Sequence, residues 1–219
     1  RMGIDVDLVL EHVPAGARVI DLGAAPLVTT GALAALGYDV RGVDLRPERF
    51  AGAIETLGLD VRRCDIEREP LPFADESAAA VLFNELFEHL RIDPIFTLGE
   101  ALRVLEPGGV MLLSTPNLRS FRGIRNLLLH DEGYAVSGGV YRQWEKLRTL
   151  GHMGHVREYT ATETVAFLER IGFRCEALVY RGGHGAGIVG MAEKMAPALR
   201  PFFSVIARRP RNPASGAGQ

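Results

Sequence analysis

Short apolar runs alternate with amphipathic stretches along most of the chain, and this pattern predicts alternating strands and helices. Mostly apolar runs that suit strands cover residues 18–22, 39–44, 59–64, 78–83, 110–114, 173–180 and 201–207. Apolar residues at helical spacing cover residues 5–12, 28–36, 46–57, 94–105, 161–171 and 188–195. We therefore predict an α/β fold with a doubly wound, seven-stranded, mostly parallel sheet, whose last strand is antiparallel beside the sixth.

The first strand, Arg18–Leu22, begins a βαβ unit that has the features of a nucleotide-binding site. Gly23 releases the chain into a tight turn before the first helix, and the second strand ends in Asp44. A helix N-terminus can receive a charged cofactor, and an acid after the second strand can bind ribose hydroxyls. We expect the rest of the chain to extend the sheet that this unit begins.

Two helices carry recognisable end signals. Thr160 followed by Glu163 is a capping box, which predicts a helix over 161–171 that stops at Gly172. The helix over 94–105 is expected to end in a turn at Glu106–Gly109, because neither proline nor paired glycines continue a helix. Its buried face is predicted to contain residues 95, 98, 102 and 105.

Between residues 118 and 158 the alternation of strand and helix lapses. Two amphipathic segments, 121–129 and 140–150, lie within this stretch, and Tyr134, Tyr141 and Trp144 supply rings that can stack on a sugar or form a small local core. A long insertion after a strand's carboxyl end suits a helical lid or substrate cap, with a plain surface insertion as the alternative. We predict a single domain over 1–207 and a flexible tail over 208–219.

Composition narrows the classes of function. The 219 residues suit one domain, and 25 basic against 27 acidic side chains give a net charge of −2, so nucleic acid is not an expected partner. The two cysteines form no metal or disulfide motif. We find no membrane-spanning run and no signal-peptide pattern, and therefore expect a cytoplasmic protein. The oligomeric state is left open.

Several segments together resemble the class I S-adenosylmethionine-dependent methyltransferases. Val19–Gly23 resembles their first cofactor motif, Asp44 follows Asp21 by 23 positions as the ribose-binding acid does, and Asp65–Ile66 resembles the pair beside the adenine. The stretch 100–117 resembles the family's helix, turn and fifth strand. The resemblance implies a Rossmann-like methyltransferase fold. It also implies an S-adenosylmethionine site formed by Asp21, Gly23, Ala24, Ala25, Asp44, Leu45, Asp65, Ile66 and Asn84.

The loop after the first strand departs from this family. The usual Gly-x-Gly-x-Gly is replaced by residues 23–27, Gly-Ala-Ala-Pro-Leu. We expect Leu27, with Pro26, to narrow the methionine end of the cofactor site. A nicotinamide dinucleotide is the competing cofactor, but its pyrophosphate needs several loop glycines and would meet the like charge of Asp21.

Glu85, Glu88 and His89 follow the fourth strand at positions i, i+3 and i+4, so in a helix they would share one face. A divalent metal would relieve the repulsion between the two carboxylates, and His155 offers a fourth ligand. The pattern resembles metal-dependent ubiquinone-pathway O-methyltransferases and small-RNA 2′-O-methyltransferases. Oxygen and nitrogen ligands suit Mg, Mn, Fe or Zn. In the metal-free alternative Glu88 is structural. His152 and His184 are expected to be solvated.

These features predict an S-adenosylmethionine-dependent O-methyltransferase that acts on a hydroxyl of a small polar metabolite such as a sugar, glycan or natural product. A hydroxyl must lose its proton, so a metal or a histidine base is required. His89, His155 and Glu85 are the candidate catalytic residues. The alternatives are a small-molecule N-methyltransferase and a non-catalytic cofactor-binding relative with an altered glycine loop.

Overall fold

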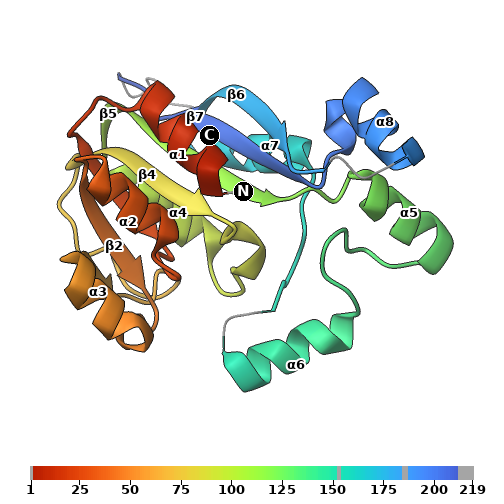
Figure 1. The fold of residues 1–219 in the computed structure, drawn as a ribbon, viewed down its shortest axis with the longest axis horizontal. Helices are drawn as coiled ribbons and strands as arrows, with labels where there is room; N and C mark the ends of the chain where they lie inside the picture. The colour runs from red at the N-terminus through yellow and green to blue at the C-terminus, as the bar shows by residue number, and fades with distance from the viewer. Residues whose placement is uncertain (1, 152–153, 184–186, 212–219) are drawn as a thin grey trace, which may run out of the picture.

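A seven-stranded sheet forms the centre of the computed structural model, which describes residues 2–151, 154–183 and 187–211 (Figure 1). The strand order is β3-β2-β1-β4-β5-β7-β6. The four pairings among β1 to β5 are parallel, and β7 runs antiparallel to both of its neighbours, β5 and β6. The strands are β1 (Arg18–Leu22), β2 (Asp39–Asp44), β3 (Asp60–Arg63), β4 (Ala78–Asn84), β5 (Leu105–Pro116), β6 (Arg174–Arg181) and β7 (Phe202–Arg208). The predicted fold class is therefore confirmed.

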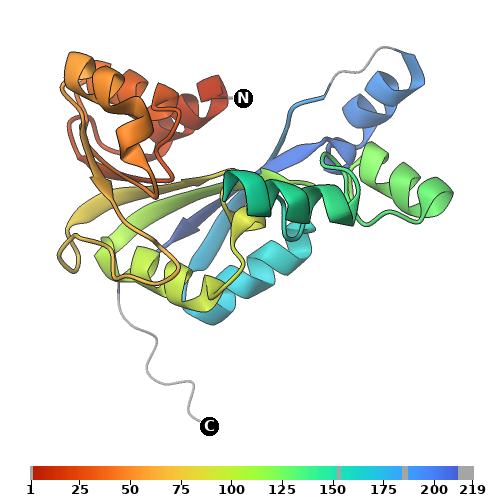
Figure 2. The ribbon, with the colours of Figure 1, turned by 90° about the horizontal axis from the view of Figure 1, so that it is seen from below.

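Helices cover both faces of the sheet (Figure 2). One layer contains α1 (Met2–His12), α2 (Val28–Ala35) and α3 (Ala51–Leu57), and the other contains α4 (Pro94–Val104) and α7 (Ala161–Ile171). Three further helices, α5 (Phe121–His130), α6 (Val140–Leu150) and α8 (Gly187–Met195), lie beyond the carboxyl end of the parallel strands. Short 3-10 turns occur at η1 (Pro47–Phe50), η2 (Phe87–His89) and η3 (Pro197–Leu199).

The central strand β4 explains why the sheet needs two covering layers. Val81 and Phe83 belong to the core cluster under α4 and α7, whereas Ala80 and Leu82 belong to the cluster under α1 and α2. Because successive strand residues point to opposite faces, a continuous apolar run such as β4 must be buried on both sides. No helix in the described part of the chain is long and apolar enough to cross a membrane.

Strand β1 lies between β2 and β4. The chain adds β2 and β3 on one side of β1 and then crosses to add β4 and β5 on the other side. Asp21 pairs with Gly42 on one side and with Leu82 on the other. Open α/β sheets bind ligands outside the carboxyl ends of the strands at such a reversal. The topology therefore places the candidate site beside Asp21.

The 118–158 insertion begins and ends at one place. Asn117 and Tyr159 form a parallel bridge, and the Leu118 amide donates to the Tyr159 carbonyl over 2.9 Å. The two amphipathic segments predicted within it are the helices α5 and α6. The Thr160–Glu163 capping box at the start of α7 and the Gly172 stop are also present.

Three local predictions were wrong. Glu106–Gly109 is part of β5 rather than a separate turn, because Leu105 already pairs with Ala78 and the strand accommodates the glycines at a register shift. Ile95 is 63% exposed, although its spacing predicted burial. The helix predicted over 46–57 is divided into η1 and α3 at Phe50.

The flexible tail was predicted to begin at residue 208, which is too early in the chain. Arg208 is the last residue of β7, and the Arg209 guanidinium donates to the carbonyls of Leu102, Arg103 and Leu105 at the end of α4. A cation at a helix C-terminus satisfies carbonyls that have no partner within the helix. Residues 212–219 lie outside the described residues, so the rest of that prediction stays a prediction.

Candidate functional site

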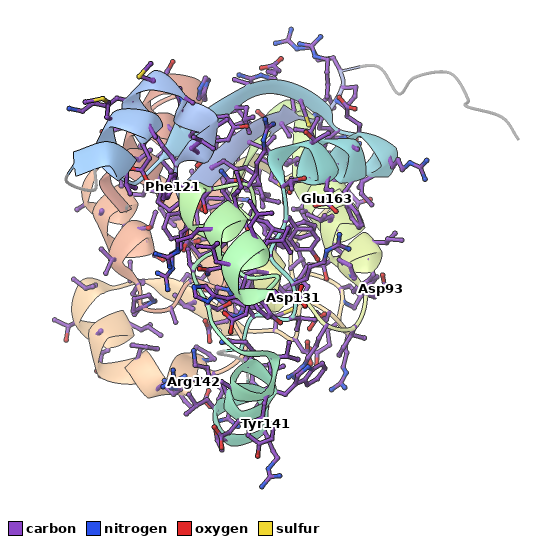
Figure 3. All side chains as sticks on the ribbon, turned by 90° about the vertical axis from the view of Figure 1, so that its right-hand side faces the viewer. Asp93, Phe121, Asp131, Tyr141, Arg142 and Glu163 are labelled. Carbon is purple, nitrogen blue, oxygen red and sulfur yellow. The ribbon has the colours of Figure 1, made fainter. Side chains whose placement is uncertain are left out.

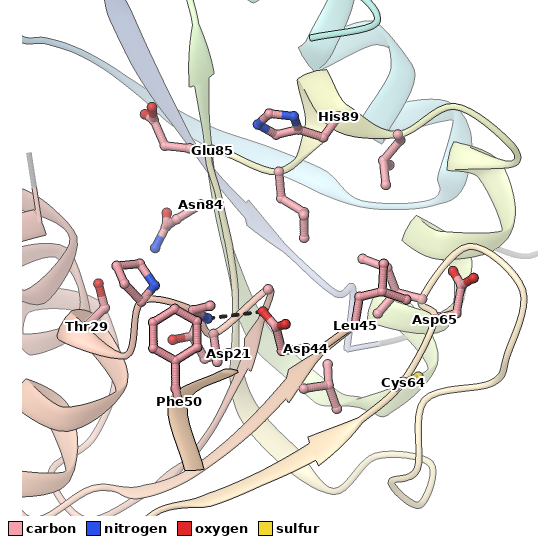
Figure 4. Close-up of a pocket in the computed structure, with 18 of the residues that line it drawn as sticks. Asp21, Thr29, Asp44, Leu45, Phe50, Cys64, Asp65, Asn84, Glu85 and His89 are labelled. Carbon is pink, nitrogen blue, oxygen red and sulfur yellow. Dashed lines mark hydrogen bonds between the residues drawn. The ribbon is translucent and has the colours of Figure 1, made fainter. Parts of the chain in front are cut away.

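A cavity of about 510 Å³ opens at the carboxyl ends of β1, β2, β3 and β4. This volume is within the range of small-molecule sites. All nine residues predicted to bind the cofactor line it: Asp21, Gly23, Ala24, Ala25, Asp44, Leu45, Asp65, Ile66 and Asn84. Figure 4 shows Asp44 and Asp65 along one side of the cavity, with Asn84, Glu85 and His89 on another.

Asp44 is held by backbone donors at the end of β2. Its Oδ1 accepts from the Arg46 amide over 2.8 Å and its Oδ2 accepts from the Ala25 amide over 3.2 Å (Figure 4). Each carboxylate oxygen has a second lone pair, so the fixed carboxylate can also accept from two neighbouring hydroxyls. This is the arrangement that a ribose diol requires.

Asp21 is a buried acid with one neutral donor. The Thr30 hydroxyl donates to its Oδ2 over 2.7 Å, and the residue is 4% exposed. The pKa of Asp21 is raised to about 7, chiefly by burial and also by the nearby carboxylates of Asp5 and Asp44, which together outweigh the lowering effect of the Thr30 hydrogen bond. A buried acid without a cationic partner is suited to receive the positive charge of a ligand.

The loop that replaces the three glycines still brings its backbone close to the cavity. The amides of Gly23 and Ala24 both donate to the Val43 carbonyl, at 2.9 and 3.0 Å, and Gly23 has a φ of +69°. Gly42 lies behind this loop, where an added Cβ would stand 2.9 Å from the Ala24 Cβ. The small residue at position 42 therefore allows the loop to lie close to β2.

The expectation that Leu27 narrows the cavity was wrong. Leu27 adopts a left-handed φ of 71° and is 4% exposed, and it does not line the cavity, whereas Pro26 does. Its left-handed backbone turns the side chain into the protein interior at the start of α2. Leu27, which replaces the third glycine, therefore does not occupy the cavity.

Asn84 presents an unpaired donor to the cavity. Its Oδ1 accepts from the Ser114 hydroxyl over 3.0 Å, while its Nδ2 is buried with no hydrogen-bond partner among the described residues. A buried polar atom without a partner is costly, so a ligand acceptor at this position would stabilise it. Together with Asp44 and Asp21, this donor fits a ligand with a diol, a cationic group and a hydrogen-bond acceptor. S-adenosylmethionine has all three.

Glu85, Glu88 and His89 do not share a helix face. Glu85 has a φ of 49°, and the residues that follow form only the 3-10 turn η2. The carboxylate of Glu85 is directed towards Arg181, with Oε1 3.6 Å from the Nη2 of that arginine. Glu85, one of the four predicted metal ligands, is therefore not part of the cluster that the other three form, although it does line the cavity.

Glu88, His89 and His155 form a compact cluster at the edge of the cavity. Each can offer one ligand atom, and these atoms lie within 4.8 Å of one another. His89 also lines the cavity, so the cluster and the cavity share a wall. Three of the four predicted metal ligands therefore lie together: Glu88 and His89 from η2, and His155 from the segment after α6.

Hydrogen bonds orient both imidazole rings. The Nδ1 of His89 lies 3.0 Å from the Gly154 carbonyl, which can only accept, so this nitrogen carries a proton and the lone pair of the neutral ring is on Nε2. The Nδ1 of His155 lies 3.0 Å from Glu158 Oε1 and is oriented in the same way. Metal-binding histidines are held in this manner, by an acceptor on the other ring nitrogen.

The two buried carboxylates of this region, Glu88 and Glu158, have pKa values shifted in opposite directions. Burial, and next the charge of Glu85, raise the pKa of Glu88 to about 8. Thr115 donates to its Oε2 over 2.8 Å, but its Oε1 has no hydrogen-bond partner among the described residues. An orphaned carboxylate oxygen beside two lone-pair nitrogens fits a divalent cation.

Glu158 is the opposite case. Burial alone would raise the pKa of Glu158, but donors from His155, Ser137 and Ala135 outweigh it and hold the pKa below its usual range. The Ser137 hydroxyl and amide both donate to Oε1, at 2.6 and 3.0 Å. Glu158 therefore fixes the ring of His155 and ties residues 135–137, in the middle of the insertion, to the end of the insertion beside Tyr159.

Sequence reasoning missed the residues that reach the cavity from distant parts of the chain. Asp5 on α1 is 5% exposed and lines the cavity, and it accepts from the Nη1 of Arg181 at the end of β6. Arg49 and Phe50 of η1 line the opposite part. No sequence motif marks these positions, because only the folded sheet brings them together. His152 and His184, which were predicted to be solvated, lie outside the described residues.

Comparisons with known proteins agree with this arrangement. A family profile described as "Methyltransferase domain" matches residues 5–178. A protein of Mycolicibacterium smegmatis named "Probable S-adenosylmethionine-dependent methyltransferase" is 33% identical over 118 residues, which are 54% of this chain and 37% of the relative. The match therefore spans little more than a third of that relative.

Solved structures share the fold. An S-adenosylmethionine-dependent methyltransferase from Mesorhizobium loti has 22% identity and a TM-score of 0.65, covering 93% of this chain and 96% of the other. The 1,6-didemethyltoxoflavin-N1-methyltransferase of Burkholderia thailandensis, with bound S-adenosylhomocysteine, has 17% identity and a TM-score of 0.64 over 95% and 78%. The [4+2]-cyclase SpnF, with 18% identity and a TM-score of 0.65 over 95% and 82%, shows that the fold alone does not determine the reaction.

Replacing Asp44 should weaken S-adenosylmethionine binding. Asp44→Asn removes the charged acceptor from the ribose side of the cavity and should raise the Kd about 10- to 100-fold in calorimetric titration, since hydrogen bonds to charged groups contribute about 1.5–3 kcal/mol. Asp39→Asn is the matched control, because Asp39 lies at the other end of β2 and pairs with Arg18 and Arg41. Equal affinities for the two variants would contradict the assignment.

Replacing Asp21 should stabilise the ligand-free protein. The pKa of Asp21 is about 7 in the folded protein against an ordinary 3.8, so the folded state holds the proton more tightly and stability falls as the pH rises through that window. Asp21→Asn should therefore raise the free energy of unfolding at pH 8 by up to about 4 kcal/mol, less as the pH approaches 4. Urea unfolding at several pH values measures this, and a gain independent of pH would contradict the cause.

Proposed function

Because the chain belongs to the methyltransferase-domain family, we propose that it is an S-adenosylmethionine-dependent enzyme that methylates a hydroxyl group of a small polar metabolite. Sugars, glycans and other polar natural products are the acceptor class. The observation that carries the proposal is the Glu88–His89–His155 cluster at the wall of the cavity. An acceptor hydroxyl placed beside this cluster would also be beside the cofactor site.

The cofactor side of the reaction needs binding and alignment. S-adenosylmethionine supplies a methyl carbon that its sulfonium already activates for in-line displacement. Asp44 would bind the ribose, Asp65 and Ile66 the adenine edge, and Asp21 the cationic methionine end. The Ile66 carbonyl accepts from Thr97 over 3.0 Å, which holds the adenine loop against α4.

The acceptor side needs a group that removes a proton. An aliphatic alcohol does not ionise at neutral pH, so alignment alone is not sufficient. A divalent metal ion would lower the pKa of a hydroxyl bound to it. In the proposal the chain holds this ion through Glu88 Oε1 and through the Nε2 atoms of His89 and His155. Thr115 and Glu158 orient the ligands from behind.

A metal-free version uses the same residues differently. The Nε2 of His89 or of His155 would then accept the hydroxyl proton directly, with the acceptors on Nδ1 stabilising the imidazolium that forms. Glu85 also lines the cavity, but its carboxylate faces Arg181, with Oε1 3.6 Å from the Nη2 of that arginine. In this version Glu85 is therefore a positioning residue and not the base. Metal content and the effect of chelation distinguish the two versions.

N-methylation of a small amine is the second candidate. Asp5 and Glu85 add carboxylates to the cavity wall, and a cationic amine would be attracted there. A neutral amine needs less help with proton removal than an alcohol, so it leaves the Glu88–His89–His155 cluster without a role. We therefore rank it below O-methylation.

Glu88 and Glu85 form a matched pair for testing the metal. Glu88→Gln should reduce bound Mn²⁺ or Zn²⁺ at least tenfold, measured by equilibrium dialysis with elemental analysis, because it removes the charged ligand of the cluster. Glu85→Gln should leave metal content near that of the unchanged protein. If both variants bind metal equally, or if the unchanged protein binds none, the metal-free version replaces this one.

The acceptor class is tested by a screen of metabolites with labelled S-adenosylmethionine. Hydroxylated sugars and natural products should gain one methyl group by mass spectrometry, and tandem fragmentation should place it on oxygen. Transfer only to amine nitrogen would overturn O-methylation in favour of the second candidate. Tight binding of S-adenosylmethionine without transfer to any hydroxyl or amine would favour a non-catalytic relative.

A further inference from the structure

The helices α5, α6 and α8 carry most of the large hydrophobic side chains that the described part of the chain exposes. Leu128 and Leu129 on α5 are 74% and 71% exposed, Tyr141 on α6 is 79% exposed and Met195 on α8 is 81% exposed. Figure 3 looks onto the surface formed by these helices, with Phe121 at the start of α5 and Tyr141 at the start of α6. We call the exposed side of α5, α6 and α8 the helical end face.

The helices α5 and α6 of the helical end face bury polar residues and expose apolar ones, which is the opposite of an ordinary surface helix. On α5 the buried positions are Gly123 and Asn126, and on α6 they include Gln143. Asn126 and Gln143 are turned inward to donate to the carbonyls of Tyr134 and Gly138, at 2.9 and 2.8 Å. A surface helix normally turns its apolar stripe inward, so the outward leucines of α5 are not explained by the core of this domain.

The charge of the helical end face is also distinct. The exposed or half-exposed basic residues of its helices are Arg122, Arg125, Arg142, Lys146, Arg148 and Lys194. The exposed acids are fewer: Glu145 on α6, and Asp131 and Glu132 directly after α5. The whole chain, in contrast, has slightly more acidic than basic residues. Exposed leucines and aromatic rings among arginines and lysines are the composition of helices that bind in the plane of a membrane surface.

We propose that the helical end face docks on an anionic lipid bilayer. The leucines of α5 and the rings of Tyr141 and Trp144 would enter the boundary between headgroups and acyl chains, while the basic residues would contact lipid phosphates. A second copy of the chain is a poorer occupant, because a symmetric contact through this face would set its basic residues against one another.

The cavity lies next to this face. Gly151, which ends α6, lines the cavity, and its carbonyl accepts from Arg91 over 3.1 Å. The Gly154 carbonyl that orients His89 follows three residues later. A docked protein would therefore have its cavity mouth near the headgroup region. The docking itself does not depend on which group the enzyme methylates.

Vesicle flotation tests the proposal with the full chain. The probes are vesicles of pure phosphatidylcholine and vesicles of equal parts phosphatidylcholine and phosphatidylglycerol. We expect binding to the anionic vesicles, with affinity that falls as salt is raised, and much weaker binding to the neutral ones. Arg142→Glu should weaken binding at least fivefold, and Leu128→Glu about tenfold, because each removes an interfacial contact and adds a repelled charge.

The controls use exposed positions elsewhere. Ile95→Glu on α4 is the control for Leu128, since Ile95 is 63% exposed, and Arg63→Glu on β3 is the control for Arg142. Both should bind vesicles as the unchanged protein does, and circular dichroism should show all four variants folded. The proposal fails if the anionic vesicles are not bound, if the controls lose binding equally, or if light scattering shows a dimer that Leu128→Glu dissociates.

Discussion

The pairing of β1 with β2 on one side and with β4 on the other determines where the site lies. This arrangement brings the ends of three strands to one edge, so Asp21, Asp44 and Asn84 meet although they are far apart in sequence. The Ala25 amide then ties the loop after β1 to the carboxylate at the end of β2. A one-residue slip in this pairing would turn each of these side chains to the other face of the sheet.

Two buried glutamates near the cavity illustrate how donors determine charge. Glu158 receives donors from a serine, from backbone amides and from a histidine, and its pKa is held low despite burial. Glu88 has one hydroxyl donor and the charge of Glu85 nearby, and its pKa is raised. The first carboxylate therefore stabilises the insertion in the folded protein as an anion, whereas burial disfavours the charged form of the second.

The cofactor side was predictable from the sequence because its residues stand at strand ends, where register fixes the direction of each side chain. Asp21 and Asp44 reach the predicted cavity for this reason, and Asp65 reaches it from the turn two residues after β3. The predicted helix face shared by Glu85, Glu88 and His89 was wrong because the i, i+3, i+4 spacing assumes an α-helix, and the left-handed backbone at Glu85 precludes one. Asp5 and Arg181 could not be predicted, since their contact joins positions 176 residues apart and no local pattern encodes it.

The bridge between Asn117 and Tyr159 has a consequence for how such a domain can diverge. Because the two ends of the insertion meet at one point, the segment between them can be lengthened, shortened or exchanged without altering the strands on either side. The entropy of closing the segment changes only slowly with its length. Selection can therefore vary the 118–158 insertion while the strand ends that line the cavity keep their geometry.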